Sequence, residues 1–166
     1  MHLYRDPIRI TAAVLLLATT TVLTGCGGGE GEAEETTTIT VIPKGTTHVF
    51  WQSIHAGANK AADSLGIEVN WVGPVREDAR QEQIQIVQNQ VINRVDGIVL
   101  APLDASALRS PVQSATEAGI PVVIIDSRLN DAENLITSFV ATDNREGGRL
   151  GGERLGELLG GSGEVM

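Results

Sequence analysis

Apolar residues along this chain follow two different periods. Short unbroken apolar runs alternate with longer stretches in which apolar residues recur every three or four positions. The clearest run lies within residues 118–128, where Val and Ile fill the positions between a Gly-Ile-Pro start and Asp126. A run without polar alternation is typical of a strand that is covered on both faces. Because ligands bind outside the carboxyl edge of a parallel sheet, Asp126 is the first candidate binding residue, although Asp also caps turns after strands.

The two periods predict alternating strands and helices from residue 39 onward. Strands are expected at residues 39–42, 67–72, 97–101, 118–128 and 135–142, and helices at residues 49–65, 76–94, 111–118 and 144–159. On the second helix, one face carries Ile84, Val87, Val91 and Ile92 and is expected to be buried. Short connections between strands and helices predict βαβ units. We therefore expect an α/β fold with a doubly wound parallel sheet.

The first 38 residues differ from the rest of the chain. Residues 1–25 begin with positive charge and continue as a Thr-rich apolar stretch too short to span a bilayer comfortably, which predicts a signal peptide. The sequence Leu-Thr-Gly-Cys at 23–26 resembles a bacterial lipobox, which implies lipidation of Cys26. A plain secretory signal or a short membrane anchor is the alternative. Residues 26–38 are rich in Gly and Glu with little to bury, and predict a disordered tether.

Composition and spacing argue against several classes of function. A formal net charge of -9 without a Lys/Arg cluster argues against a nucleic-acid partner. The single cysteine leaves no intramolecular disulfide, and neither His48 nor the glutamates of the tether have the neighbours that a metal site needs. Ser53 and His55 lie two positions apart on a helix and cannot form a nucleophile-base pair. We therefore expect no enzymatic activity, no metal and no cofactor.

Phe50 and Trp51 stand out because aromatic residues are only 3% of the chain. They follow the first strand, in the loop that opens a helix, and so belong to the same carboxyl edge as Asp126. Flat apolar rings that stack on sugars, together with carboxylates that accept hydrogen bonds from hydroxyls, suit a carbohydrate site. The alternative is that Phe50 packs in the core between helix and sheet and that Trp51 covers the rim of this core. For Phe50 we expect the core, and for Trp51 the site. The apolar stripe of the first helix is expected to consist of Phe50, Ile54, Ala58, Ala61 and Leu65.

Four short motifs occur in one order. They are Val-Phe-Trp-Gln-Ser at 49–53, Val-Asp-Gly-Ile at 95–98, Gly-Ile-Pro-Val-Val at 119–123 and Ala-Thr-Asp-Asn at 141–144. From residue 39 to residue 166 the chain resembles the ribose-binding-protein type of periplasmic substrate-binding protein. This resemblance implies the solute-binding component of a sugar ABC importer, which captures a monosaccharide between two lobes and delivers it to a membrane permease.

The resemblance also implies roles for single residues. Phe50 and Trp51 match the aromatic pair that sandwiches the sugar, and Asp126 matches the carboxylate that accepts hydrogen bonds from its hydroxyls. His48 stands where the family often has Asn, which weakens an assignment to ribose itself.

Two further positions depend on the same resemblance. Family members often place Arg directly after the strand-end Asp, whereas this chain has Ser127 there and Arg128 one position later. Either Arg128 reaches round to the ligand or that contact is lost. Asp143 and Asn144 match the first crossover between lobes, so we expect them to act as a hinge.

On this basis the chain divides into a sugar-binding lobe at 39–142 and a segment at 143–166. That segment would hold the hinge crossover with the first helix and the opening strand of a second lobe. We expect the piece to be incomplete, to bind sugar weakly and to associate, and the complete protein to be a monomer. The expected partners are a small sugar, an ABC permease and, through the lipid anchor, a membrane of the cell envelope, on its periplasmic or extracellular face. The alternatives are a ligand-sensing lobe of a signalling or regulatory protein, including one for a furanosyl autoinducer, and a secreted α/β hydrolase.

Overall fold

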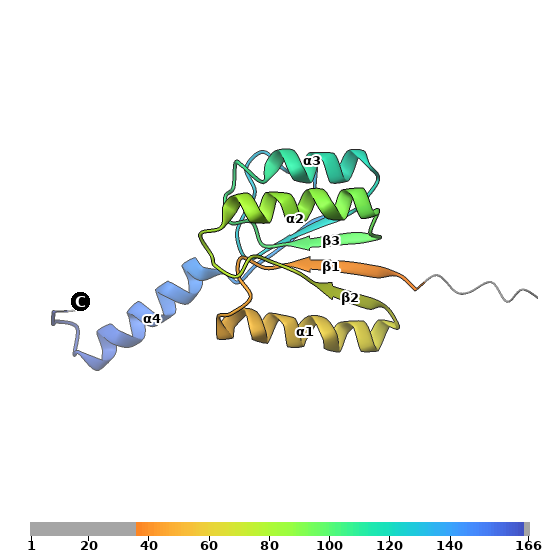
Figure 1. Cartoon of the computed structure of the whole chain (residues 1–166). Helices are drawn as coiled ribbons and strands as arrows, with labels where there is room; N and C mark the ends of the chain where they lie inside the picture. Colours follow the sequence, from red (N-terminus) through yellow and green to blue (C-terminus); the bar gives the residue numbers. More distant parts are fainter. Residues whose placement is uncertain (1–35, 165–166) are drawn as a thin grey trace, which may run out of the picture. The chain divides into compact units, whose positions relative to one another are not determined.

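The computed structural model describes residues 36–164. Five strands and four helices follow one another along this part of the chain (Figure 1). The elements are β1 (Thr38–Ile42), α1 (Val49–Leu65), β2 (Glu68–Trp71), α2 (Arg80–Asn93), β3 (Gly97–Leu100), α3 (Arg109–Glu117), β4 (Val122–Ile125), β5 (Ser138–Val140) and α4 (Asn144–Leu158). None of the helices in this part of the chain has the length and hydrophobicity needed to cross a membrane. The predicted signal peptide, Cys26 and most of the predicted tether lie outside the described residues.

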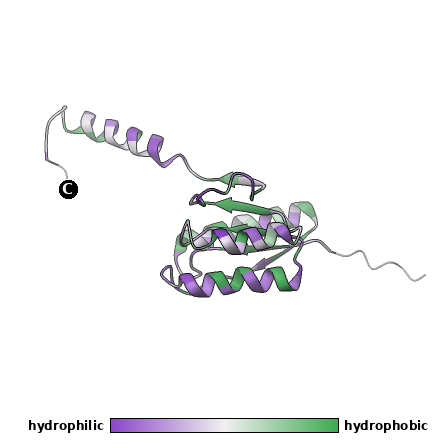
Figure 2. Cartoon of the chain, turned by 90° about the horizontal axis from the view of Figure 1, so that it is seen from above, coloured by the Kyte–Doolittle hydropathy of each residue, from purple (hydrophilic) through white to green (hydrophobic). Residues whose placement is uncertain are grey.

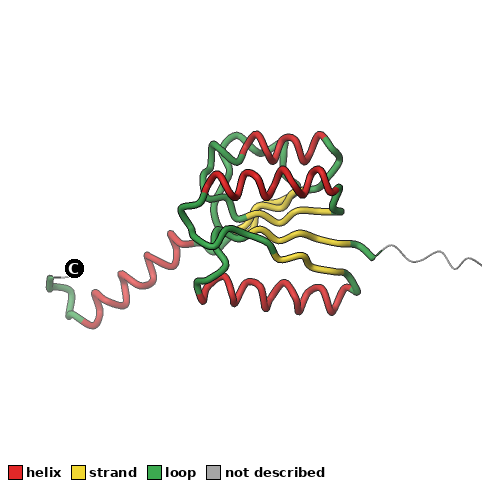
Figure 3. The backbone as a smooth tube through the Cα atoms, viewed as in Figure 1, coloured by secondary structure: helices red, strands yellow, loops and turns green. Residues whose placement is uncertain are grey.

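The five strands form one parallel sheet in the order β2-β1-β3-β4-β5. Helix α1 lies on one face of this sheet, and α2 and α3 lie on the other (Figures 1 and 3). This arrangement confirms the predicted α/β class with a doubly wound parallel sheet. The chain runs from β1 outward to β2 and then returns to β3 on the other side of β1, so the winding reverses at β1. Ligands of such sheets bind outside the carboxyl ends of the strands at this reversal.

The core fills the space between the sheet and the two helices α2 and α3. Leu100, Leu108, Val112 and Ile124 are fully buried there, and Val87 is 1% exposed. Figure 2 shows the strands mostly in the green of hydrophobic residues, whereas purple and green alternate along the helices. That alternation is the pattern from which the helices were predicted.

The predicted face of α2 is partly wrong. Ile92 is 76% exposed, whereas Gln83 and Gln90 are buried. Gln90 is tolerated because its side-chain oxygen accepts a hydrogen bond from the Thr40 hydroxyl at 3.1 Å. A polar side chain with a fixed partner can occupy a core position at little cost, and a pattern of hydrophobicity does not reveal it.

The ends of several elements are fixed by local signals in the sequence. Gly66 ends α1 in the left-handed conformation, with φ of 67°. Asp104 caps the turn after β3 by accepting hydrogen bonds from the backbone N–H groups of Ala107 and Ser106, and these bonds lower the pKa of its carboxyl group. The strands predicted at 118–128 and 135–142 are longer than the observed β4 and β5. The observed strands include only residues that pair with a neighbouring strand. No strand forms at residues 163–164, and the rest of that predicted strand lies outside the described residues.

The face of the sheet that carries α1 is left partly open. An apolar hollow there is lined by residues of all five strands and by one side of α1, among them Val41, Ile54, Val99, Ile125 and Val140. Helix α4 has no buried residue, and its Leu150, Leu155 and Leu158 are all exposed. Apolar surface of this kind is typical of an interface rather than of a finished exterior.

Candidate functional site

The start of α1 and the loops after β1, β2 and β4 meet at the carboxyl edge of the sheet. A pocket there is lined by Lys44, His48, Phe50, Trp51, Glu77 and Asp126. Four of these six residues were predicted from the sequence as site residues. Lys44 and Glu77 were not predicted.

The position of Asp126 is fixed by β4, which it follows, and by a backbone hydrogen bond to β5. Its backbone N–H donates to the carbonyl of Val140 in β5 at 3.0 Å, immediately after the end of β4. Its φ of 65° lies in the left-handed region, which Asp tolerates better than most residues. The backbone thus turns sharply at this point.

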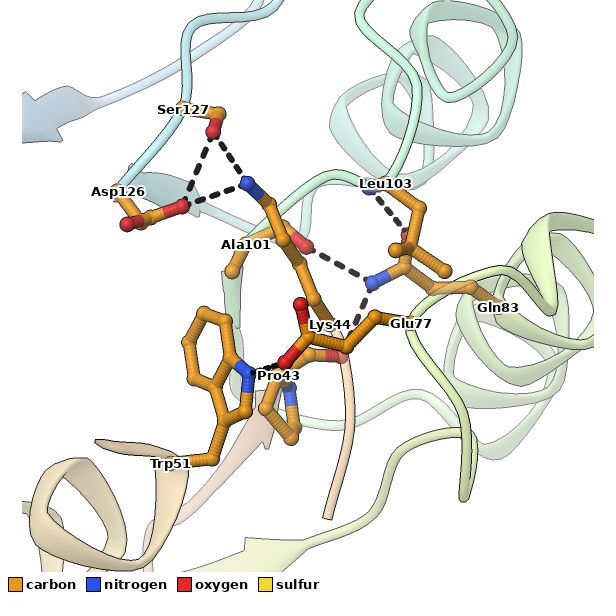
Figure 4. Close-up of polar contacts among 9 residues, drawn as sticks. All are labelled: Pro43, Lys44, Trp51, Glu77, Gln83, Ala101, Leu103, Asp126 and Ser127. Carbon is orange, nitrogen blue, oxygen red and sulfur yellow. Dashed lines mark hydrogen bonds and ion pairs between the residues drawn. The ribbon is translucent and has the colours of Figure 1, made fainter. Parts of the chain in front are cut away.

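The carboxylate of Asp126 is paired with a cation from the loop that follows β1 (Figure 4). Lys44 Nζ lies 2.6 Å from Asp126 Oδ2 and also donates to the hydroxyl of Ser127, which in turn donates to Oδ2 at 3.0 Å. The Lys44 and Asp126 side chains are 21% and 30% exposed, so this ion pair is partly shielded from water but still accessible. The sequence carried one signal for Lys44, because it follows the first strand by two residues at the edge where the site was expected.

A buried glutamine fixes the backbone beside Lys44. The side-chain amide of Gln83 donates to the carbonyls of Pro43 at 3.0 Å and Ala101 at 2.8 Å, and its oxygen accepts from the backbone N–H of Leu103 at 2.8 Å (Figure 4). Gln83 is fully buried. One side chain of α2 therefore joins the carboxyl ends of β1 and β3, and thereby holds the start of the loop that carries Lys44.

The two aromatic residues exchange the places that we expected from the sequence. Trp51 is 2% exposed, and its indole N–H donates to Glu77 Oε1 at 2.7 Å (Figure 4), whereas Phe50 is 46% exposed. Their rings meet edge to face with centroids 4.9 Å apart. The expectation of a core Phe50 was wrong because the buried stripe of α1 contains Trp51 and Ala62, one position out of phase with the stripe predicted through Phe50 and Leu65. Both aromatic residues still line the pocket.

The other predicted residues have identifiable local roles. His48 caps α1, since its Nδ1 accepts from the backbone N–H of Phe50 at 3.1 Å. The guanidinium of Arg128 lies 4.4 Å above the ring centroid of Phe139, and in residues 36–164 it forms no ion pair with Asp126. The cation beside the strand-end carboxylate is therefore Lys44 rather than Arg128.

Asp143 and Asn144 begin the last helix. Asp143 caps α4 by accepting a hydrogen bond from the backbone N–H of Glu146 at 2.9 Å, and Asn144 lines the apolar hollow. Their hinge role stays a prediction. Among residues 36–164 no cluster of His, Cys, Asp or Glu is arranged to hold a metal ion.

Comparison with known families identifies the fold and the class of protein. Residues 39–166 match the model of the periplasmic binding protein domain. This chain belongs to the periplasmic binding protein family. The match covers the sheet from Ile39 onward and every residue of the pocket.

The relatives of this periplasmic binding protein include several sugar-binding proteins. The D-ribose/D-allose-binding protein of Pseudomonas aeruginosa is 34% identical over 91% of this chain and 49% of its own length. A solute-binding protein of an ABC transporter from Agrobacterium vitis, with bound D-fucose, is 41% identical with a TM-score of 0.69, over 74% of this chain and 43% of its own. A carbohydrate transporter solute-binding protein from Agrobacterium radiobacter, in complex with D-arabinose, is 35% identical with a TM-score of 0.69. The similarity covers 76% of this chain and 42% of that protein. The chain thus spans about half the length of the curated relative. These relatives are binding proteins and not enzymes.

Proposed function

We propose that this chain is the sugar-binding component of an ABC importer and that it holds a monosaccharide at the carboxyl edge of its sheet. The supporting observation is the pocket that Asp126 lines together with an exposed aromatic residue, Phe50, in a chain related to sugar-binding proteins. The carboxylate accepts hydrogen bonds from sugar hydroxyls, and the ring covers the apolar face of the sugar. Within residues 36–164 no backbone N–H group donates to the Asp126 carboxylate, which contacts Lys44 and Ser127 instead, so this side chain does not act as a turn cap.

The rest of the transport cycle is proposed from the family. The sugar is enclosed between this lobe and a second lobe, with Asp143 and Asn144 at the crossover, and the closed protein is recognised by a membrane permease. Closure excludes water and adds the contacts that one lobe lacks. The protein works as a monomer outside the cytoplasmic membrane.

Binding is tested by thermal denaturation of the full-length mature protein with D-ribose, D-allose, D-arabinose and D-fucose. A ligand that binds only the folded state raises its stability, by about 2.7 kcal/mol at a hundredfold excess over the Kd. We expect at least one of these sugars to raise the midpoint, with sodium gluconate at the same concentration as the control for non-specific effects. No shift with any sugar in the panel would contradict the proposed function.

We further propose that Cys26 carries a lipid and anchors the protein to the cell envelope. The proposal rests on the Leu-Thr-Gly-Cys sequence after an apolar stretch. Cells that express the protein are fed a fatty-acid probe, and the wild type is compared with Cys26→Ser. Incorporation in the wild type alone supports the anchor, and equal incorporation in both proteins rules it out.

A further inference from the structure

The loops after β1 and β2 pack closely against each other beside the pocket. A Cβ atom placed on Gly45 would lie 2.9 Å from Glu77 Cγ, which is closer than side-chain carbons approach one another. The hydroxyl of Thr47 also donates to the backbone carbonyl of Val75 at 3.4 Å. Gly45 is buried, so the absence of a side chain there leaves the space in which the Glu77 side chain lies.

Glu77 reaches the indole of α1 through this close approach. Its Oε1 atom accepts a hydrogen bond from the indole N–H of Trp51 at 2.7 Å (Figure 4). The charged residues on either side, Arg76 and Asp78, pair with each other, whereas Glu77 forms no ion pair within residues 36–164. Hydrogen bonds to a carboxylate are stronger than those to a neutral oxygen. The only polar atom of this buried indole is therefore held by a charged acceptor from another loop.

The indole of Trp51 in turn supports the aromatic ring that is exposed in the pocket. Phe50 is 46% exposed, and its ring meets the indole edge to face, with the ring planes at 79°. An exposed side chain changes its rotamer readily, and contact with a fixed neighbour restricts this freedom. A ring that is already oriented loses less conformational entropy when a ligand binds to it.

We propose that Glu77 is a positioning residue of the sugar site. By holding the indole of Trp51, it fixes the orientation of the Phe50 ring before the ligand arrives, and it does so without contacting the sugar. This inference rests on the proposed sugar-binding function and adds to it the residue that preorganises the stacking face. The loss of affinity on removal of Glu77 should therefore not exceed the loss on removal of the Phe50 ring.

The first test is calorimetry on the full-length protein with D-ribose, D-allose, D-arabinose or D-fucose, whichever the wild type binds most tightly. Glu77→Ala should weaken binding about three- to tenfold, which is within the contribution of one aromatic contact. Glu77→Gln keeps an acceptor oxygen for the indole N–H and should restore most of the lost affinity. The control is Glu82→Ala, which removes an exposed carboxylate outside the pocket and should keep the wild-type Kd.

The variant Trp51→Phe separates positioning from direct contact. It removes the indole N–H but keeps an aromatic ring, so Glu77→Ala should cost no further affinity in this background. An equal loss in both backgrounds would mean that Glu77 contacts the sugar itself, which would overturn the inference. If Trp51→Phe binds no sugar, the rescue by Glu77→Gln decides, and a Glu77→Gln variant as weak as Glu77→Ala overturns the inference.

The variant Gly45→Ala tests the same contact with Glu77 left in place. Its added methyl group must displace the Glu77 side chain, so it should weaken sugar binding to about the same extent as Glu77→Ala. Wild-type affinity in both Glu77→Ala and Gly45→Ala would overturn the inference and leave the proposed function intact. If the wild type binds none of the sugars, the proposed function itself fails, so the two failures are distinguishable.

Discussion

Phe50 and Trp51 are adjacent in sequence but have different physical roles. Successive residues of an α-helix point about 100° apart, so only one of two neighbours can face the sheet. In α1 that residue is Trp51, whose indole N–H is bonded to Glu77, and Phe50 is left 46% exposed in the pocket. The buried indole therefore supports the site, and the exposed phenyl ring is free to contact a ligand.

This difference predicts opposite effects of two alanine substitutions. Trp51→Ala should lower the free energy of unfolding by about 3–5 kcal/mol, because it removes a large buried side chain. Phe50→Ala should change the free energy of unfolding by less than about 1 kcal/mol but weaken sugar binding by roughly tenfold, since its ring contributes a stacking face. Urea denaturation and calorimetry separate the two quantities. A large loss of stability in Phe50→Ala, with unchanged sugar affinity, would show that its role is structural.

Helix α2 controls the geometry of the sheet edge through Gln83. Because this amide satisfies two carbonyls and one backbone N–H in a buried place, its loss leaves several polar groups without partners. Each such group costs about 1–3 kcal/mol. Gln83→Leu should therefore lower the free energy of unfolding by about 3 kcal/mol, measured by urea denaturation.

The matched control is Gln85→Leu on the exposed side of the same helix. Its effect should stay within about 0.5 kcal/mol. Equal stabilities of the two variants would mean that the hydrogen bonds of Gln83 are replaced by water and do not hold the edge together.

The elements were largely predictable from local sequence, whereas the contacts between them were not. A short, unbroken apolar run such as 122–125 is typical of a strand that is buried on both faces. Gly66 marks the end of α1 because glycine adopts a positive φ readily. The ion pair of Lys44 and Asp126, in contrast, joins residues that are 82 positions apart in the sequence. The sequence around either residue does not indicate its partner. Gln83 was missed because a polar residue gives no hydrophobic signal.

The candidate site could be predicted in part for the same reason. The position of Asp126 at the end of a strand follows from the topology of parallel sheets, so it was found. The phase of α1 was off by one residue, because adjacent apolar residues at 50 and 51 and again at 61 and 62 fit two neighbouring stripes, and hydrophobicity does not choose between them. That single shift exchanged the expected burial of Phe50 and Trp51.

At the level of the whole chain, the apolar hollow on the α1 face indicates a surface that needs a cover. We expect a polypeptide of residues 36–164 to self-associate in light scattering and to bind a hydrophobic dye. Val140→Lys, which places a charge in the hollow at a position that is 59% exposed, should reduce both effects. Val75→Lys is the matched control, since Val75 is equally exposed and lies outside the hollow. A monodisperse monomer that binds no dye would contradict this prediction.

The role of Asp126 in sugar binding is measured by calorimetry on the full-length protein with the sugar that stabilises it most. Asp126→Asn suits this test because Asn tolerates the left-handed backbone of this position while it removes the charge. Asp63→Asn, on the exposed face of α1, is the control. We predict a loss of affinity of about 1–3 kcal/mol for Asp126→Asn, roughly 5- to 150-fold in Kd, and no change for Asp63→Asn. An unchanged Kd in Asp126→Asn would contradict a sugar site at this edge of the sheet.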